Sequence, residues 1–163
     1  NRKRQDIKFV LVGDGKLKPF LQEVTRQSRL ENVIFHDPVT KPDLMGLLES
    51  ANIGMQILAN VPAFYYGTSP NKFFDYIAVG LPVLNNYPGW LAELIKEYDC
   101  GFVVPPGDRK AFGDAIEEAS DNRNDLLKKS QHAKKLSQKF SRERLAIQWV
   151  DWLEKTFNEY RSV

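Results

Sequence analysis

Residues 69–85, which read SPNKFFDYIAVGLPVLN, decide the fold of this chain. Ser69 followed by Pro70 is a typical helix start, because serine caps a helix well and proline suits the first helical position. Gly80 is a typical helix stop, and the apolar residues after it predict a short strand. A helix that leads directly into a buried strand is part of the repeating unit of a parallel sheet.

The same alternation extends along the chain on both sides of this segment. The five predicted strands span residues 7–12, 32–35, 53–58, 82–85 and 101–104. The predicted helices between them span residues 17–29, 40–51, 69–80 and 90–97. Thr40 is expected to cap the second of these helices, with Asp43 three residues later. Because the strands are apolar without alternation, we expect burial on both faces. The sequence predicts an α/β fold, a Rossmann-like, three-layer, doubly wound parallel sheet with extra C-terminal helices.

Composition excludes several classes of protein. The chain has 163 residues, a net charge of +2, one cysteine and two histidines. Cys100 alone cannot build a disulfide framework or a cysteine metal cluster. His36 and His132 are too far apart in sequence to suggest a metal site, and no Asp-x-Asp pair is present. The charge is too mild to indicate nucleic acid binding. No stretch of about 18 apolar residues predicts a membrane span.

The start of the chain is polar and has neither an initiator methionine nor a signal peptide. We therefore expect the sequence to begin within a longer protein.

The helix start near residue 70 has the properties of an anion site. Its first amides, around Asn71 and Lys72, should point outward at the positive end of the helix dipole, which suits a phosphate. Helical spacing places Asn71, Lys72 and Asp75 along one edge, where a carboxylate would suit the hydroxyls of a ribose. The residues alone also allow an ordinary capped helix with a solvated acid.

Other loops at the same edge of the predicted sheet offer weaker candidates. Gly13 and Gly15 would let a phosphate approach the backbone, or they serve only a tight turn. Tyr66 and its aromatic neighbours shape a sugar pocket or pack the loop. Gly89 would allow a close approach to a ligand, and Trp90 is a cleft wall or a packing residue.

Four segments in order resemble one known family. Residues 12–15 (VGDG), 33–35 (VIF), 69–83 and 101–108 (GFVVPPGD) are similar to the C-terminal, donor-binding domain of GT-B retaining glycosyltransferases of family 4. The likeness is closest to the bacterial branch that builds capsule and O-antigen polysaccharide. It implies a nucleotide-sugar-binding domain over residues 1–140 that lacks its first strand and helix. Residues 141–163 would form a helix that returns toward an absent N-terminal acceptor domain.

The resemblance also implies roles for individual residues. The donor diphosphate would be held by Gly13, Gly15, Ser69, Asn71 and Lys72. Asp75 would bind the ribose, and the backbone at Val39 would bind the base. The donor sugar or cleft would be lined by Tyr66, Gly67, Thr68 and Gly89. The first acid of the family's Glu-x7-Glu motif aligns with Gly67, so this chain lacks that carboxylate. No catalytic residue is identified, and no metal or other cofactor is expected.

The implied activity is transfer of a hexose or amino sugar from a nucleoside diphosphate, with UDP as the expected nucleotide, onto a glycan or lipid-linked acceptor. The leaving phosphate would assist attack on the donor's front face. The chain alone is expected to be inactive, because the acceptor domain and the diphosphate-clamping Arg and Lys are absent. Two alternatives stay open: a non-catalytic nucleotide-binding or regulatory module, and half of a sugar-nucleotide epimerase.

We expect a cytoplasmic location. Between positions 123 and 144 the sequence has eight Lys and Arg residues and only two acidic residues. This excess suits contact with anionic lipid at the cytoplasmic face of a membrane, or it is a solvated helix face.

Overall fold

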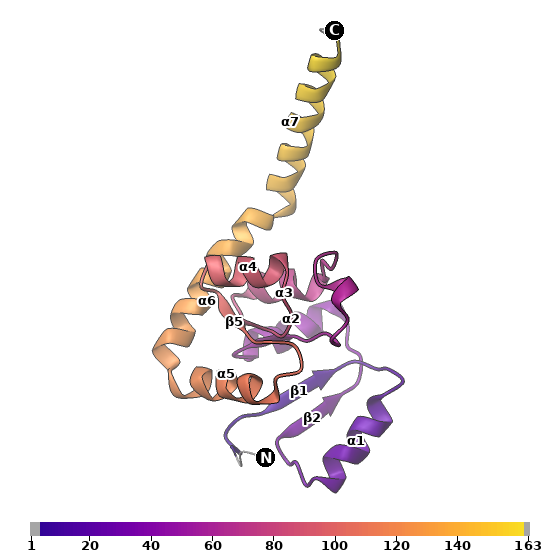
Figure 1. Cartoon of the computed structure of the whole chain (residues 1–163), viewed down its shortest axis with the longest axis vertical. Coiled ribbons are helices and arrows are strands. Elements are labelled where there is room, and N and C mark those ends of the chain that lie inside the picture. Colours follow the sequence, from indigo (N-terminus) through magenta and orange to yellow (C-terminus); the bar gives the residue numbers. More distant parts are fainter. Residues whose placement is uncertain (1–3, 162–163) are drawn as a thin grey trace. The chain divides into compact units, whose positions relative to one another are not determined.

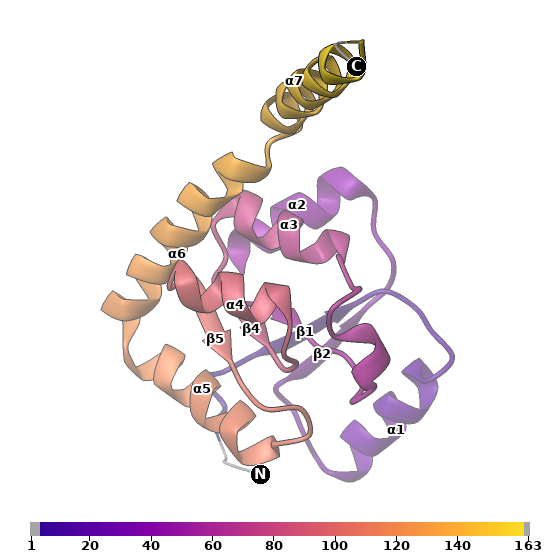
Figure 2. The ribbon, with the colours of Figure 1, turned by 45° about the horizontal axis from the view of Figure 1, so that its top comes forward.

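The computed structural model describes residues 4–161, which form an α/β structure in which every strand pairs in parallel (Figure 1, Figure 2). By compactness the chain divides into an N-terminal unit, Asn1–Leu47, and a C-terminal unit, Leu48–Val163.

The N-terminal unit contains two short strands and a helix. These are β1 (Phe9–Val12), α1 (Lys18–Gln27) and β2 (Val33–His36). β1 and β2 pair in register, with Phe9 opposite Val33. Helix α2 (Lys41–Ser50) follows and extends across the division. Its predicted cap is confirmed: the Thr40 hydroxyl donates to Asp43 Oδ2 at 2.5 Å and accepts from the Asp43 N–H at 3.4 Å.

Apolar side chains of this unit are exposed. None of residues 4–47 is buried, and Leu17, directly before α1, and Phe20 on α1 are 66% and 63% exposed. Val10 on β1 is 46% exposed. Its strand nevertheless has the continuous apolar sequence of a strand covered on both faces. Residues 4–47 of the N-terminal unit therefore form no core of their own.

The C-terminal unit is built on three parallel strands in the order β3-β4-β5. The strands are β3 (Gly54–Gln56), β4 (Val83–Asn85) and β5 (Gly101–Val103). The helices are α3 (Asn71–Val79), α4 (Trp90–Glu97), α5 (Arg109–Asp121), α6 (Arg123–Ser137) and α7 (Arg142–Arg161). Two 3₁₀ turns, η1 (Pro62–Phe64) and η2 (Gln138–Phe140), complete the unit.

The core of this unit surrounds β4. All three residues of β4 are fully buried: the apolar Val83 and Leu84, as the sequence predicts, and also the polar Asn85. Around the strand pack Phe73 and Ile77 from α3, Leu91 and Ile95 from α4, and Leu136 from α6. Burial of these side chains at about 1.5–3 kcal/mol each is the main stabilising contribution to the unit.

The predicted single sheet of five strands is not observed. Residues 4–161 contain two separate sheets, β1-β2 and β3-β4-β5. Within residues 4–161, β1 pairs with β2 inside the N-terminal unit, and β3 pairs with β4 inside the C-terminal unit. The parallel α/β class itself is confirmed.

The predicted cap of α3 was wrong by one position. The helix begins at Asn71, and Pro70 takes the capping position in an extended conformation without a side-chain cap. Ser69 precedes a proline, which favours extended backbone and leaves its hydroxyl out of capping position. The helix ends as predicted at Gly80, whose φ of 82° is in the left-handed region that glycine adopts freely.

Helix α6 is held to the core by polar contacts as well as apolar ones. Lys129 Nζ donates to the Asp99 carboxylate and lies 3.4 Å from Asp125 Oδ2. Ser130 Oγ donates to the Gly80 carbonyl at 2.7 Å. Burial alone would lower the pKa of Lys129, but its bond to Asp99 and the charges of both acids raise it. Among the basic residues between positions 123 and 144, at least Lys129 therefore stabilises the fold rather than facing solvent.

Helix α7 has no covering on any side. Each of its residues 142–161 is exposed, and Trp149 stacks on Trp152 with ring centroids 5.1 Å apart. The helix begins close to the predicted boundary after residue 140, whereas the compact units divide at Leu47. Its return toward an acceptor domain stays a prediction. Within residues 4–161, no helix has the length and apolar character needed to cross a bilayer.

We predict a loss of stability in alkali that depends on Cys100. This thiol is fully buried, and burial raises its pKa from 9.0 to about 11. The unfolded thiol would ionise first, so the folded state binds the proton more tightly and loses stability as pH rises through this window. Urea unfolding between about pH 9 and pH 11 should show the wild type losing on the order of 2 kcal/mol more than Cys100→Ala. Equal losses in the two proteins would contradict this assignment.

Candidate functional site

The two glycines predicted to hold a phosphate lie in the loop after β1. Gly13 has a φ of 130°, and its N–H donates to the His36 carbonyl at 3.1 Å. The Gly15 N–H donates to the carboxylate of Asp14 at 2.8 Å. Both amides therefore already have acceptors, and an anion at Gly15 would have to displace the Asp14 carboxylate.

Lys18 joins this loop to the loop after β2. Its ammonium donates to the Gly13 carbonyl at 3.0 Å and to Asp37 Oδ1 at 2.7 Å. The hydrogen bond from Lys18, together with its charge, lowers the pKa of Asp37. Val39, the predicted base contact, is half-buried two residues further on. Sequence analysis missed Lys18 as the link between these two loops, because its bond to Asp37 joins residues 19 apart.

The start of α3 has the exposed backbone amides and the lysine that the sequence predicted there. Ser69, Asn71 and Lys72 are exposed, and within residues 4–161 neither Asn71 nor Lys72 has a side-chain hydrogen bond. The Phe73 N–H donates to the Pro70 carbonyl at 3.1 Å, so the amides before it have no acceptor within the helix. Asp75 is half-buried one turn later, on the side of Lys72. The helix thus offers free amides, a cation and a carboxylate in sequence.

Asn86 fixes the loop that leads into α3. Its side-chain amide accepts from the Leu58 N–H at 2.8 Å and donates to the Leu58 carbonyl at 2.9 Å. These two bonds connect the chain after β3 to the chain after β4, just beyond the last ladder pair, Gln56 and Asn85. Sequence reasoning missed Asn86, although a polar residue directly after a buried strand was a usable signal.

Gly89 makes room for the same loop. Its φ is 113°, and a Cβ there would lie 2.3 Å from the Tyr65 carbonyl oxygen. Tyr65 in turn stacks on Tyr87 with centroids 6.2 Å apart. Glycine is thus required here for loop packing, and the predicted contact of Gly89 with a donor stays a prediction.

The remaining predicted residues lie on the exposed side of this loop. Tyr66 is 70% exposed, and Thr68 is half-buried. A Cβ at Gly67 would meet no atom within 4 Å.

A comparison with protein families identifies the class of the chain. The family model described as "Glycosyl transferases group 1" matches residues 1–122. The chain belongs to the group 1 glycosyltransferases. No functionally curated protein matches it in sequence.

Solved structures place this glycosyltransferase domain in the GT-B fold. Anabaena HepE, solved with UDP-glucose, is similar with a TM-score of 0.73 at 19% identity over 91% of this chain and 41% of HepE. S. aureus TarM, in a structure with Fondaparinux, alpha-GlcNAc-glycerol and UDP, has a TM-score of 0.74 at 18% identity over 91% of this chain and 29% of TarM. WaaG, a glycosyltransferase of lipopolysaccharide biosynthesis, has a TM-score of 0.63 at 20% identity over 80% of this chain and 34% of WaaG. The chain thus spans well under half of each.

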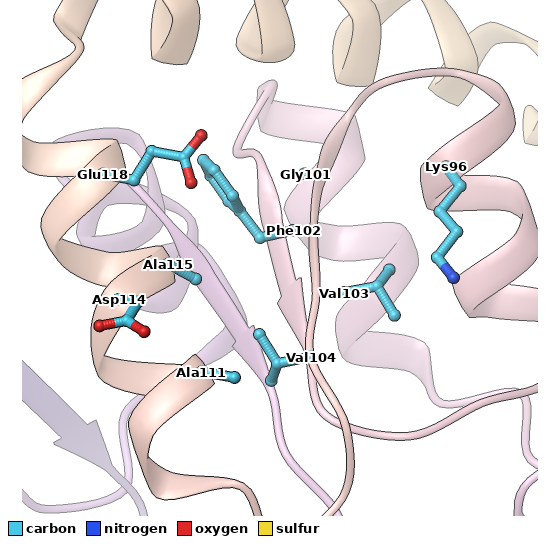
Figure 3. A pocket seen from close by; sticks show the side chains of 9 residues that line it. All are labelled: Lys96, Gly101, Phe102, Val103, Val104, Ala111, Asp114, Ala115 and Glu118. Atoms are coloured by element: carbon cyan, nitrogen blue, oxygen red, sulfur yellow. The ribbon is translucent and has the colours of Figure 1, made fainter.

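One pocket of this glycosyltransferase domain lies elsewhere, between β5 and α5 (Figure 3). Phe102 and Val104 form its apolar part, with Asp114 and Glu118 on α5 and Lys96 on α4. None of the predicted donor residues lines it. Residues 4–161 also bring together no group of three or more His, Cys, Asp or Glu side chains able to hold a metal ion. The expectation of a metal-free site stays a prediction.

We predict that Asn86→Ala destabilises the domain. The change removes both bonds to Leu58 and leaves a partly buried amide and carbonyl without partners, at a cost of about 1–3 kcal/mol. Urea unfolding followed by circular dichroism measures the loss. Asn124→Ala, at an exposed position in α6, is the matched control and should change stability by no more than about 0.5 kcal/mol. Equal stability of both variants would show that the Leu58 contact contributes nothing.

Proposed function

We propose that this chain is the C-terminal, donor-binding half of a retaining family 4 glycosyltransferase that acts in the synthesis of bacterial capsule or O-antigen polysaccharide. The observation that carries the proposal is the start of α3, where exposed amides at Asn71 and Lys72 precede Asp75 by one turn. Family membership and the UDP-bound structures of HepE and TarM support a nucleotide-sugar donor.

The start of α3 supplies the chemistry that such a reaction needs. Negative charge develops on the diphosphate as the sugar departs, and helix amides stabilise it without reorganisation. Lys72 adds a full positive charge beside them. Asp75 would accept hydrogen bonds from the ribose hydroxyls and so align the nucleotide. The transferred group would be a hexose or amino sugar.

The apolar side chains of the N-terminal unit are exposed, which supports the proposal that the intact enzyme is larger. We propose that a further strand and helix, and an acceptor domain, contact this chain in the whole protein. The exposed apolar side chains of β1 and α1 favour the first, and the exposed face of α7 favours the second. Contact of the basic residues between positions 123 and 144 with anionic lipid also stays a prediction, as does a cytoplasmic location.

Nucleotide titration of the isotope-labelled chain tests the donor site. We expect UDP to shift amides at residues 69–75 and Asp75→Ala to weaken its binding about tenfold, because a charged hydrogen-bond acceptor is lost. GDP, ADP and CDP in parallel titrations identify the base. Asp151→Ala, on exposed α7, is the control and should bind UDP as the wild type does. Shifts confined to other residues, with Asp75→Ala binding normally, would refute the site.

Hydrogen exchange tests the proposal that β1 is covered in the intact, larger enzyme. Amides of residues 10–12 in β1 should exchange rapidly in the 163-residue chain and become at least about tenfold more protected in the intact enzyme. Amides of residues 83–85 in β4 should be protected in both. Unchanged exchange of β1 would contradict the proposed covering of the N-terminal unit.

A further inference from the structure

Trp90 contacts both sides of the entry into α3. Its indole Nε1–H donates to the Thr68 carbonyl at 3.0 Å. The same ring lies 6.4 Å from the ring centroids of Phe73 and Phe74, in the first turn of the helix. Trp90 is also the first residue of α4, which begins beside the start of α3 (Figure 2). One side chain thus links the segment before the helix to the helix itself.

The hydrogen bond fixes the direction of one peptide group. The peptide between Thr68 and Ser69 is planar and trans, so its carbonyl and its N–H point in opposite directions. With the Thr68 carbonyl held toward the indole, the Ser69 N–H is directed away from it. Ser69 is exposed, and no group within residues 4–161 accepts this N–H. The Ser69 amide is therefore available beside those of Asn71 and Lys72.

The opposite orientation would reverse the electrostatics. A flipped peptide would turn the Thr68 carbonyl oxygen outward, toward the position of an anion at the helix start. Pro70 cannot compensate, because it has no N–H. A dipole aimed at a developing charge has a large effect on its stability, and its direction decides the sign.

The surroundings of Thr68 leave the indole as the side-chain donor to this carbonyl. The Thr68 hydroxyl donates instead to the Phe64 carbonyl. Gly89, directly before Trp90, packs against the Tyr65 carbonyl, which fixes where α4 begins relative to the loop. The position of Trp90 is thus set by the loop that it orients.

We infer that Trp90 is a positioning residue that holds the Thr68–Ser69 peptide with its N–H toward the donor diphosphate. This inference rests on the proposed function and adds a residue that acts through the backbone without touching the donor.

The first test compares ligands that differ only in phosphate. Trp90→Phe keeps an aromatic ring but removes the N–H, and it should weaken UDP binding about tenfold while leaving uridine binding unchanged. Trp149→Phe, the same substitution on exposed α7, should leave both unchanged. If Trp90→Phe loses stability but retains the wild-type ratio of UDP to uridine affinity, the residue is only structural and the inference is overturned.

A second variant tests the inference in case Trp90→Phe does not fold. Benzothienylalanine at position 90 retains the bicyclic ring and replaces N–H by sulfur, so packing is preserved while the bond is lost. It should show the same selective loss of UDP affinity. Unchanged UDP binding in this variant would overturn the inference.

Exchange of the indole protons separates this inference from the proposed function. In the wild type without ligand, the Trp90 Nε1–H should exchange at least about tenfold more slowly than those of Trp149 and Trp152. Equally fast exchange would overturn the Trp90 contact whether or not UDP binds. Slow exchange without any UDP binding would refute the proposed donor site and retain the contact.

Discussion

A parallel strand of uninterrupted apolar residues must be covered on both faces, and the rest of this structure depends on that constraint. The apolar residues of β4, Val83 and Leu84, meet it fully, because α3, α4 and α6 bury the whole strand, including its polar last residue Asn85. The loops that leave β3 and β4 then emerge from a rigid base, which is where open parallel sheets bind ligands. β1 is apolar along its whole length, yet none of residues 4–47 is buried, so this part of the N-terminal unit has secondary structure but no core. Order at the candidate site therefore derives from β4.

The secondary structure of this chain was largely predictable because its signals are local. Gly80 ends α3 through its left-handed backbone, and Thr40 caps α2 through its own hydroxyl. Ser69 failed as a cap because the proline after it imposed a different backbone, a local effect that outweighed residue preference. The number of sheets was not predictable in this way. Strand pairing depends on which neighbours are present, and strand sequences do not specify them.

The residues of the candidate site also differ in whether local sequence signals could identify them. Asn71, Lys72 and Asp75 were identified from helical spacing, which fixes their positions relative to one another. Asn86, Trp90 and Lys18 were missed as positioning groups because each acts across many residues. Trp90 bonds to a residue 22 positions away, and Asn86 to one 28 positions away. A sequence shows an asparagine or a tryptophan at such a place, but only the fold supplies the carbonyl it meets.

Gly67 and Gly89 differ in whether packing requires a glycine at their positions. At Gly89 a side chain would collide with the Tyr65 carbonyl, so the fold itself requires glycine. At Gly67 a Cβ would meet nothing within 4 Å, and this residue lies on the exposed side of the loop that leads into α3. Packing therefore does not exclude a carboxylate at position 67. Under the proposed function, this loop lacks the acid that resembling enzymes carry, and the exposed backbone amides of residues 69, 71 and 72 remain its candidate contacts to a donor.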